Sequence, residues 1–360
     1  MTLNGKQHLL LPSFTKTAMT KSFFSLLLLL AGIWMACKND PKPTPPQGAV
    51  DAAEEQDPEL RRINALLEKD PKNDSLLYWR AALYWKMDVF DLAVRDINEA
   101  MRIDSFRPAY YHLMADIYLD YGRPNDSKRA IDVMTEAGRK FPERIPTLLK
   151  LSEFHLILRQ YSMALYTVDR ILKKDPQNAE AYFMAGRVAL DKRDTTNAIK
   201  SLQKSVQFDA SNADAWFFLG RIFSDKNNPL AVQYYDNAIR IDTNNLQARE
   251  FKGAFYKRRG EFDKAFKIYR DIIGRNPDYS YAYFDMGMMY LEMDSLQKAY
   301  DNFDFSVKTD PLFVKAYYYR GVASELEGKL ESALADYIQA SKMSPQFKEA
   351  KEARDRLEKK

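Results

Sequence analysis

The sequence predicts an all-α fold, an α-α superhelix built from about eight helix-turn-helix repeats. The first observation is a ladder of alanines at steps of 37, 34, 34, 33, 34, 34 and 34 residues: Ala93, Ala130, Ala164, Ala198, Ala231, Ala265, Ala299 and Ala333. A repeat of this length is typical of a solenoid, in which each unit packs only on its neighbours. The second observation is composition, because 46% of the residues are apolar and 13% aromatic, enough for a continuous core.

Two further columns of residues run in phase with the alanines and predict a helical hairpin in each repeat. The first holds small residues: Ala81, Ala115, Ser152, Gly186, Gly220, Gly253, Gly287 and Gly321. The second lies three residues further on and holds larger groups: Tyr84, Tyr118, His155, Phe223, Tyr256 and Tyr290. Residues three and four apart share one helix face, and small residues let two helices approach closely. Each repeat therefore pairs two helices.

Helix ends are also marked in the sequence. Many repeats close at a proline, which cannot continue a helix: Pro142, Pro176, Pro277, Pro311 and Pro345. Gly122, Gly260 and Gly328 fall between the paired helices, where a left-handed residue is needed. Asn178 and Asn212 stand where an N-cap would accept the free amides of the next helix.

These columns resemble the tetratricopeptide repeat, in which a large residue, Leu-Gly, Tyr, Ala, Phe, Ala and Pro recur over 34 residues. The best match is the unit with Trp216, Leu219, Gly220, Phe223, Ala231, Tyr235 and Ala238. The resemblance covers residues 74–347, with repeats starting near 74, 108, 145, 179, 213, 246, 280 and 314. We expect residues 57–73 to form a capping helix before the array. Residues 348–360 should form the polar helix that a terminal repeat needs.

The amino terminus predicts export. Phe23 to Ala36 is a run of fourteen residues without a charge, preceded by Lys21, and it is too short for a membrane span. The only cysteine, Cys37, follows directly, so residues 1–36 resemble a bacterial lipoprotein signal peptide, with Met19 as an alternative start. The family usually has Leu, Val or Ile where this chain has Trp34. The resemblance implies cleavage before Cys37 and acyl chains on that residue; an uncleaved membrane anchor is the alternative.

Residues 37–56 contain four prolines within nine residues and predict a semi-rigid tether. A lysine directly after the cysteine, here Lys38, resembles the pattern of lipoproteins that are sent to the outer membrane. We therefore expect the chain at the outer membrane, on its periplasmic face or at the cell surface. The net charge is +4, and the leader accounts for three of these charges through Lys6, Lys16 and Lys21. A nearly neutral mature chain gives no support to nucleic acid as the partner.

By the same resemblance, the first helix of each pair lines a concave groove that receives ligands. The second, fifth, ninth and twelfth residues of each repeat would face it. This predicts the peptide-binding residues Tyr78, His112, Phe183, Arg187, Phe217, Arg221, Lys257, Phe284 and Tyr318. Acids also fall in these positions, at Asp116, Glu153 and Glu250. Aromatic residues with two arginines suit an extended or helical peptide that bears apolar side chains and an acid. A shift of one residue in this assignment would instead make the aromatic series part of the core.

Several classes of function are disfavoured. The lysine and asparagine positions of the chaperone-binding clamp hold Tyr78, Ala82, His112 and Asp116, so that ligand class is not supported. No phosphate loop, metal-ligand histidine pair or nucleophile elbow appears, and we expect no cofactor, no metal and no enzyme activity. His155 fills a packing column and is expected to be structural.

The sequence therefore predicts a non-enzymatic adaptor or scaffold for protein or peptide partners, lipid-anchored in the bacterial cell envelope. The alternative is a structural or assembly subunit of an envelope complex for secretion, motility or outer-membrane assembly, held through surfaces outside the groove.

Overall fold

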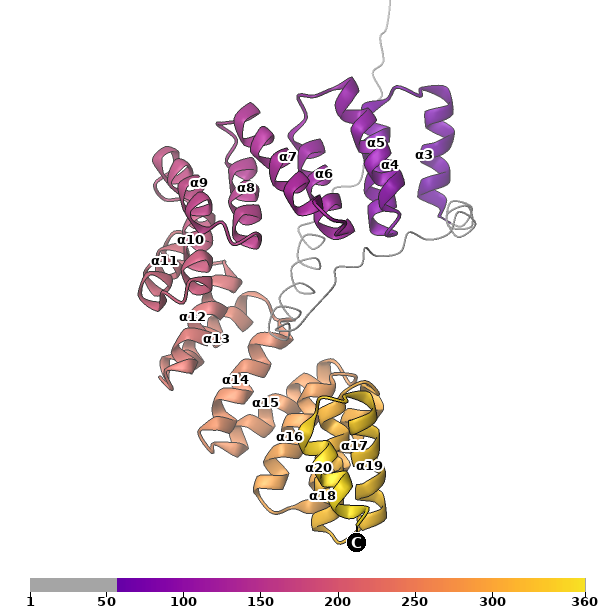
Figure 1. Ribbon diagram of the computed structural model, residues 1–360. Coiled ribbons are helices and arrows are strands. Elements are labelled where there is room, and N and C mark those ends of the chain that lie inside the picture. Colours follow the sequence, from indigo (N-terminus) through magenta and orange to yellow (C-terminus); the bar gives the residue numbers. More distant parts are fainter. Residues whose placement is uncertain (1–56, 360) are drawn as a thin grey trace, which may run out of the picture. The chain divides into compact units, whose positions relative to one another are not determined.

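The computed structural model describes residues 57–359, and every regular element in this range is an α-helix (Figure 1). This confirms the all-α class that the repeat period predicts. The predicted leader 1–36, Cys37 and the tether 37–56 lie outside the described residues. The helices are α3 Pro58–Lys69, α4 Asp74–Lys86, α5 Phe90–Ile103, α6 Pro108–Tyr121, α7 Asp126–Lys140, α8 Ile145–Ile157, α9 Tyr161–Lys174, α10 Ala179–Asp191, α11 Thr195–Phe208, α12 Ala213–Asp225, α13 Leu230–Ile241, α14 Leu246–Arg258, α15 Phe262–Arg275, α16 Ser280–Glu292, α17 Leu296–Thr309, α18 Val314–Leu326, α19 Leu330–Met343 and α20 Lys348–Leu357.

We call the even-numbered helices α4 to α18 the first helices and the odd-numbered helices α5 to α19 the second helices. The first helices begin at the residues used above as repeat starts, from Asp74 to Val314. α3 lies within the segment expected to cap the array, and α20 within the segment expected to close it.

Local chemistry sets the helix ends. The side chains of Asn178 and Asn212 accept hydrogen bonds from the amides of Ala181 and Ala215, both at 2.9 Å, which confirms them as N-caps. Gly122, Gly260 and Gly328 have φ of 67°, 71° and 79°, the left-handed conformation that glycine adopts without a steric penalty.

The alanine ladder is the contact surface within the hairpins. All eight alanines are fully buried. Opposite them, glycines on the first helices touch large side chains of the second: a Cβ on Gly220 would lie 2.6 Å from the Tyr235 ring, and one on Gly287 would lie 2.7 Å from Phe303. Real Cβ atoms essentially never show contacts this short, so the packing depends on glycine.

Contacts divide the described chain into two compact units, residues 57–150 (unit 1) and 151–359 (unit 2), with the division inside α8. Within each unit the helices of a hairpin contact each other, and each second helix contacts the first helix that follows it. First helices of successive hairpins also touch, α4 with α6 in unit 1, and α12 with α14, α14 with α16 and α16 with α18 in unit 2. We call the surface formed by these helices the first-helix face of each unit.

Within residues 57–359, none of the helices has the length and apolar character needed to cross a bilayer.

Candidate functional site

The first-helix face of unit 1 places two of the predicted residues, Tyr78 and His112. Tyr78 on α4 is half-buried and stacks on Tyr110 of α6, with ring centroids 5.2 Å apart. His112 on α6 has Nε2 at 3.1 Å from the Thr147 hydroxyl at the start of α8. Burial, reinforced by the charge of Lys150, lowers the pKa of His112 to about 4. The imidazole is therefore neutral at pH 7.

The acidic side chains of this face are already paired. Asp116 forms an ion pair with Lys150 at 2.8 Å, and the Trp85 indole donates a hydrogen bond to the Asp120 carboxylate at 2.9 Å. Burial raises the pKa of the Asp116 carboxyl, and Lys150 opposes that effect. Unit 1 thus offers aromatic surface, while its carboxylates serve mainly to join neighbouring helices.

In unit 2, Phe183 and Arg187 lie one helical turn apart on α10. The Arg187 guanidinium is 5.9 Å from the centroid of Phe183. Burial lowers the pKa of Arg187, and the charges of Glu153 on α8 and Asp214 on α12 oppose the effect. Arg187 is therefore a largely buried cation, and carboxylates of the preceding and the following hairpin stabilise its charge.

Phe217 needs a correction. It was predicted to line the groove, but its side chain is 5% exposed and belongs to a core cluster with Tyr235 and Phe255. The ring of Phe251, from α14, meets Phe217 edge-on at 5.3 Å and covers it. Phe217 therefore supports the face from below and offers a ligand little surface.

Arg221 lies on top of this aromatic layer. Its guanidinium is 5.4 Å from the Phe251 centroid and 5.8 Å and 6.0 Å from those of Phe218 and Phe217. Two helices, α12 and α14, supply these rings. The arrangement holds a cation at the junction of two hairpins in a position suited to an anionic group.

Further along unit 2, Lys257 on α14 forms an ion pair with Asp285 on α16, which also accepts a hydrogen bond from Tyr269 at 2.7 Å. Glu250 accepts a hydrogen bond from the Tyr279 hydroxyl, and burial raises the pKa of this carboxyl. These contacts join α14, α15 and α16.

The last two predicted residues are half-buried aromatics. Phe284 on α16 lies 4.9 Å from Phe313, measured between ring centroids. Tyr318 on α18 lies 5.0 Å from Phe347, which directly precedes α20. Tyr281, which was not predicted, is 47% exposed and lies 4.8 Å from Phe313.

Sequence reasoning also missed Tyr235 and Arg258. Tyr235 enters the sequence analysis only as a residue of the repeat motif, yet its hydroxyl lies near the charges of Arg221 and Arg258. Arg258 follows Lys257 directly and donates to the Ser224 hydroxyl of α12 at 2.6 Å. The sequence signal that could have identified Arg258 is its position next to Lys257, a predicted groove residue. The binding role of the other eight predicted residues stays a prediction.

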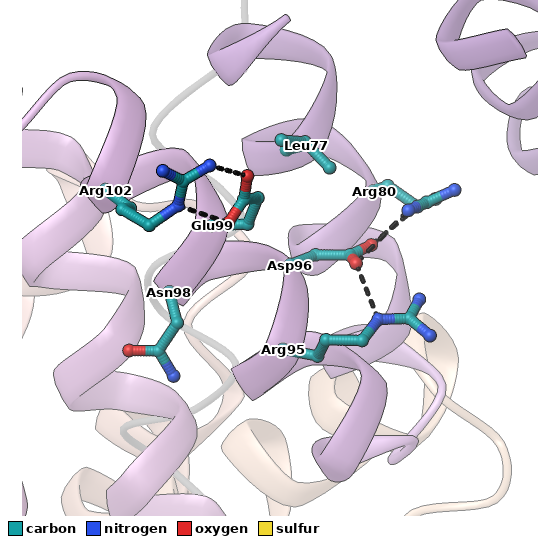
Figure 2. A pocket seen from close by; sticks show the side chains of 7 residues that line it. All are labelled: Leu77, Arg80, Arg95, Asp96, Asn98, Glu99 and Arg102. Carbon is teal, nitrogen blue, oxygen red and sulfur yellow. Dashed lines mark hydrogen bonds and ion pairs between the residues drawn. The ribbon is translucent and has the colours of Figure 1, made fainter. Parts of the chain in front are cut away.

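Unit 1 also has a shallow hollow of about 540 Å³ lined by α4 and α5 (Figure 2). Asp96, 2% exposed, accepts from Arg80 at 2.5 Å and from Arg95 at 3.1 Å, while Glu99 pairs with Arg102 at 2.6 Å. Both carboxylates are thus paired with arginines of the hollow, which is typical of structural ion pairs.

Comparison with known proteins agrees with this architecture. The tetratricopeptide repeat family model matches residues 156–213. Tetratricopeptide repeat protein 6 of Homo sapiens is 24% identical over 66% of this chain and 39% of its own length. The Hsp70-Hsp90 organizing protein of Triticum aestivum is 23% identical over 79% of the chain and 42% of its own length. The chain thus spans about two fifths of these relatives.

Among solved structures, the C-terminal part of a tetratricopeptide repeat-containing protein from Cytophaga hutchinsonii is 18% identical, with a TM-score of 0.53. The match covers 68% of this chain and 98% of that one, and it shows the fold. The shared fold and the repeated hairpins agree with the tetratricopeptide repeat match over residues 156–213.

Proposed function

We propose that this protein is a non-enzymatic adaptor or scaffold that binds a protein or peptide partner on the first-helix face of unit 2. Tetratricopeptide repeats generally mediate protein–protein interactions, and they are typically non-catalytic. The observation that carries the proposal is Arg221, held over three phenyl rings at the junction of α12 and α14. Aromatic rings supply rigid contact area, and an arginine beside them pairs with an acid.

The ligand that fits this lining is an extended or helical peptide with apolar side chains and at least one carboxylate. Phe183, Phe284 and the exposed Tyr281 extend the aromatic surface on both sides of Arg221 along α10 and α16. The carboxylates Glu250 and Asp285 of this face are already bonded to Tyr279 and Lys257. Arg221 is therefore available to a carboxylate of the partner.

We also propose that the chain is anchored in the bacterial cell envelope, at the outer membrane, by acyl chains on Cys37. The support is the apolar run that ends at Ala36 and the position of the only cysteine directly after it. Several acyl chains, at about 0.8 kcal/mol per buried methylene, give stable anchoring. The proline-containing tether would then separate the helical array from the lipid surface.

One observation favours the alternative, a structural subunit held through the second helices. On α9, Tyr166 is 59% exposed and Met163 is 49% exposed, one helical turn apart. An exposed apolar pair of this kind is a feature of some interaction surfaces.

Photo-cross-linking in intact cells separates the two functions. A benzophenone amino acid is placed at Tyr281 on a first helix or, as the matched control, at Tyr166 on a second helix, which is also exposed. The adaptor proposal predicts discrete adducts from position 281 that disappear when Arg221→Glu is added. Adducts from position 166 alone would favour the assembly subunit and contradict the adaptor.

A further inference from the structure

Three tyrosines occupy equivalent places on second helices of unit 2. Tyr235, Tyr269 and Tyr337 each pack against a glycine of the preceding first helix. All three rings are almost completely buried. Their hydroxyl groups therefore need partners within the protein or from a ligand.

Two of the three hydroxyls have a carboxylate partner. Tyr269 donates to Asp285 at 2.7 Å, and Tyr337 donates to Glu325 at 2.8 Å. The Tyr235 hydroxyl is fully buried and has no carboxylate partner and no well-formed hydrogen bond among residues 57–359, although the Ser224 hydroxyl, which accepts from Arg258, lies beside it. An unsatisfied buried hydroxyl is unfavourable, and Tyr235 differs in this from the other two tyrosines.

In the repeat that starts at residue 314, the equivalent hydroxyl has the carboxylate partner that Tyr235 lacks. Glu325 is its twelfth residue, and its carboxylate is held by the Tyr337 hydroxyl and by two bonds from Arg356 of α20, at 2.7 Å and 2.8 Å. Tyrosine, carboxylate and arginine thus form a closed trio between three successive helices.

In the repeat that starts at residue 213, the twelfth residue is Ser224. The tyrosine is present as Tyr235, and two arginines lie close to it, Arg221 on α12 and Arg258 on α14. Neither arginine forms an ion pair within the part of the chain that the structure describes. Arg258 bonds the Ser224 hydroxyl and carbonyl, at 2.6 Å and 3.0 Å. The tyrosine and the arginine of the trio are therefore present in this repeat, and the carboxylate is absent from it.

We propose that Arg221, Tyr235 and Arg258, from α12, α13 and α14, receive the carboxylate of an aspartate or glutamate side chain from the partner peptide. Arg221 and Arg258 bind the carboxylate, and the Tyr235 hydroxyl donates to it. The inference rests on the proposed function, because it names the anchor point of a peptide on the first-helix face. These residues differ from the positions of the chaperone-binding clamp.

Charge and access fit this ligand. Two arginines face one carboxylate, the exposed Asp225, so the site keeps a net positive charge. Arg258 is an exposed side chain and can exchange its contacts with Ser224 for an incoming carboxylate, which opens the way to Tyr235. Burial raises the pKa of Tyr235 to about 12, so its hydroxyl keeps its proton at pH 7 and donates.

The test uses the full chain and two fluorescein-labelled dodecapeptide libraries with amidated C-termini. The libraries differ only at one fixed central position, which is glutamate in one and glutamine in the other. Charge-assisted bonds to the carboxylate should make the glutamate library bind about tenfold more tightly by fluorescence anisotropy. A free-acid version of the glutamine library distinguishes a side-chain from a C-terminal carboxylate, and it should gain no affinity.

Three variants locate the effect. Arg221→Gln and Arg258→Gln should each lower the ratio of the affinities for the glutamate and glutamine libraries to near unity. Ser224→Glu supplies a carboxylate from within, as Glu325 does, and should abolish the preference and raise the thermal midpoint. Arg240→Gln, an exposed arginine of α13, is the matched control and should behave like the parent chain.

Four outcomes would overturn the inference. Equal binding of both libraries to the parent chain would overturn the carboxylate site and leave the proposed function standing. Binding of neither library would overturn both. A persistent glutamate preference in Arg221→Gln and Arg258→Gln would place the anion elsewhere. A rise in affinity on neutralising Asp51, Glu54 and Glu55 would show that the chain's own acidic segment fills the site, in place of a partner.

Discussion

Replacing Gly220 by alanine should destabilise the protein, although alanine is the better helix former. A Cβ at this position would lie 2.6 Å from Cδ1 and Cε1 of Tyr235, about 0.8 Å closer than ordinary contact. Tyr235 is fully buried against Phe217 and Phe255, so its ring has no free space to enter.

The two opposing effects set the magnitude. Overpacking a core contact of this kind costs about 1–3 kcal/mol. The higher helix propensity of alanine returns about 1 kcal/mol. We expect Gly220→Ala to lower the free energy of unfolding by about 1–2 kcal/mol.

The matched control is Gly274→Ala on α15. No atom lies within 4 Å of a Cβ built on Gly274, so only the propensity changes. This variant should be stabilised by about 0.5–1 kcal/mol. Urea titrations followed by circular dichroism and tryptophan fluorescence compare the midpoints, because repeat arrays do not always unfold in two states. If Gly220→Ala raised the midpoint as much as Gly274→Ala does, the close approach of α12 and α13 would not explain the glycine.

Three further predictions follow from other residues. Asp96→Asn removes the buried partner of Arg80 and Arg95 and should lower the free energy of unfolding by about 3–5 kcal/mol. Glu99→Gln, in an exposed pair, should leave the free energy of unfolding nearly unchanged; similar urea midpoints for the two variants would contradict this. The folded-state pKa of His112, about 4, lies below its ordinary value of 6.5, so the unfolded chain binds more protons between these values and stability is lost as pH falls from 6.5 to 4. His112→Gln should reduce the loss of unfolding free energy between pH 6.5 and pH 4 by up to about 3 kcal/mol. Urea titrations at a series of pH values measure this loss, and the same pH dependence in variant and parent would refute the prediction. Cys37→Ser should move the protein from the membrane to the soluble fraction, with loss of metabolic palmitate labelling, and unchanged membrane retention would count against lipid anchoring.

The sequence alone predicted the helical hairpins and their boundaries. The alanine ladder, the capping asparagines and the left-handed glycines act through contacts within one repeat or between two helices joined by a short turn. Such contacts depend on spacing along the chain, and a 34-residue period repeats the same spacing many times. For this reason eight copies in phase predicted the repeat and its spacing along the chain.

Only the tertiary structure decided which side chains of the first-helix face are available to a ligand. Phe217 and Phe183 hold the same position in their repeats, yet Phe217 is covered by Phe251 from the next hairpin and Phe183 is half-buried. The Tyr235 hydroxyl lacks a carboxylate because the twelfth residue of its own repeat is Ser224, and Arg258 of α14 donates to that serine. Both results depend on how closely neighbouring hairpins approach, and that distance is set by the packing of whole helices. Periodicity assigns a residue to a face, but the neighbouring repeat determines whether that residue is exposed.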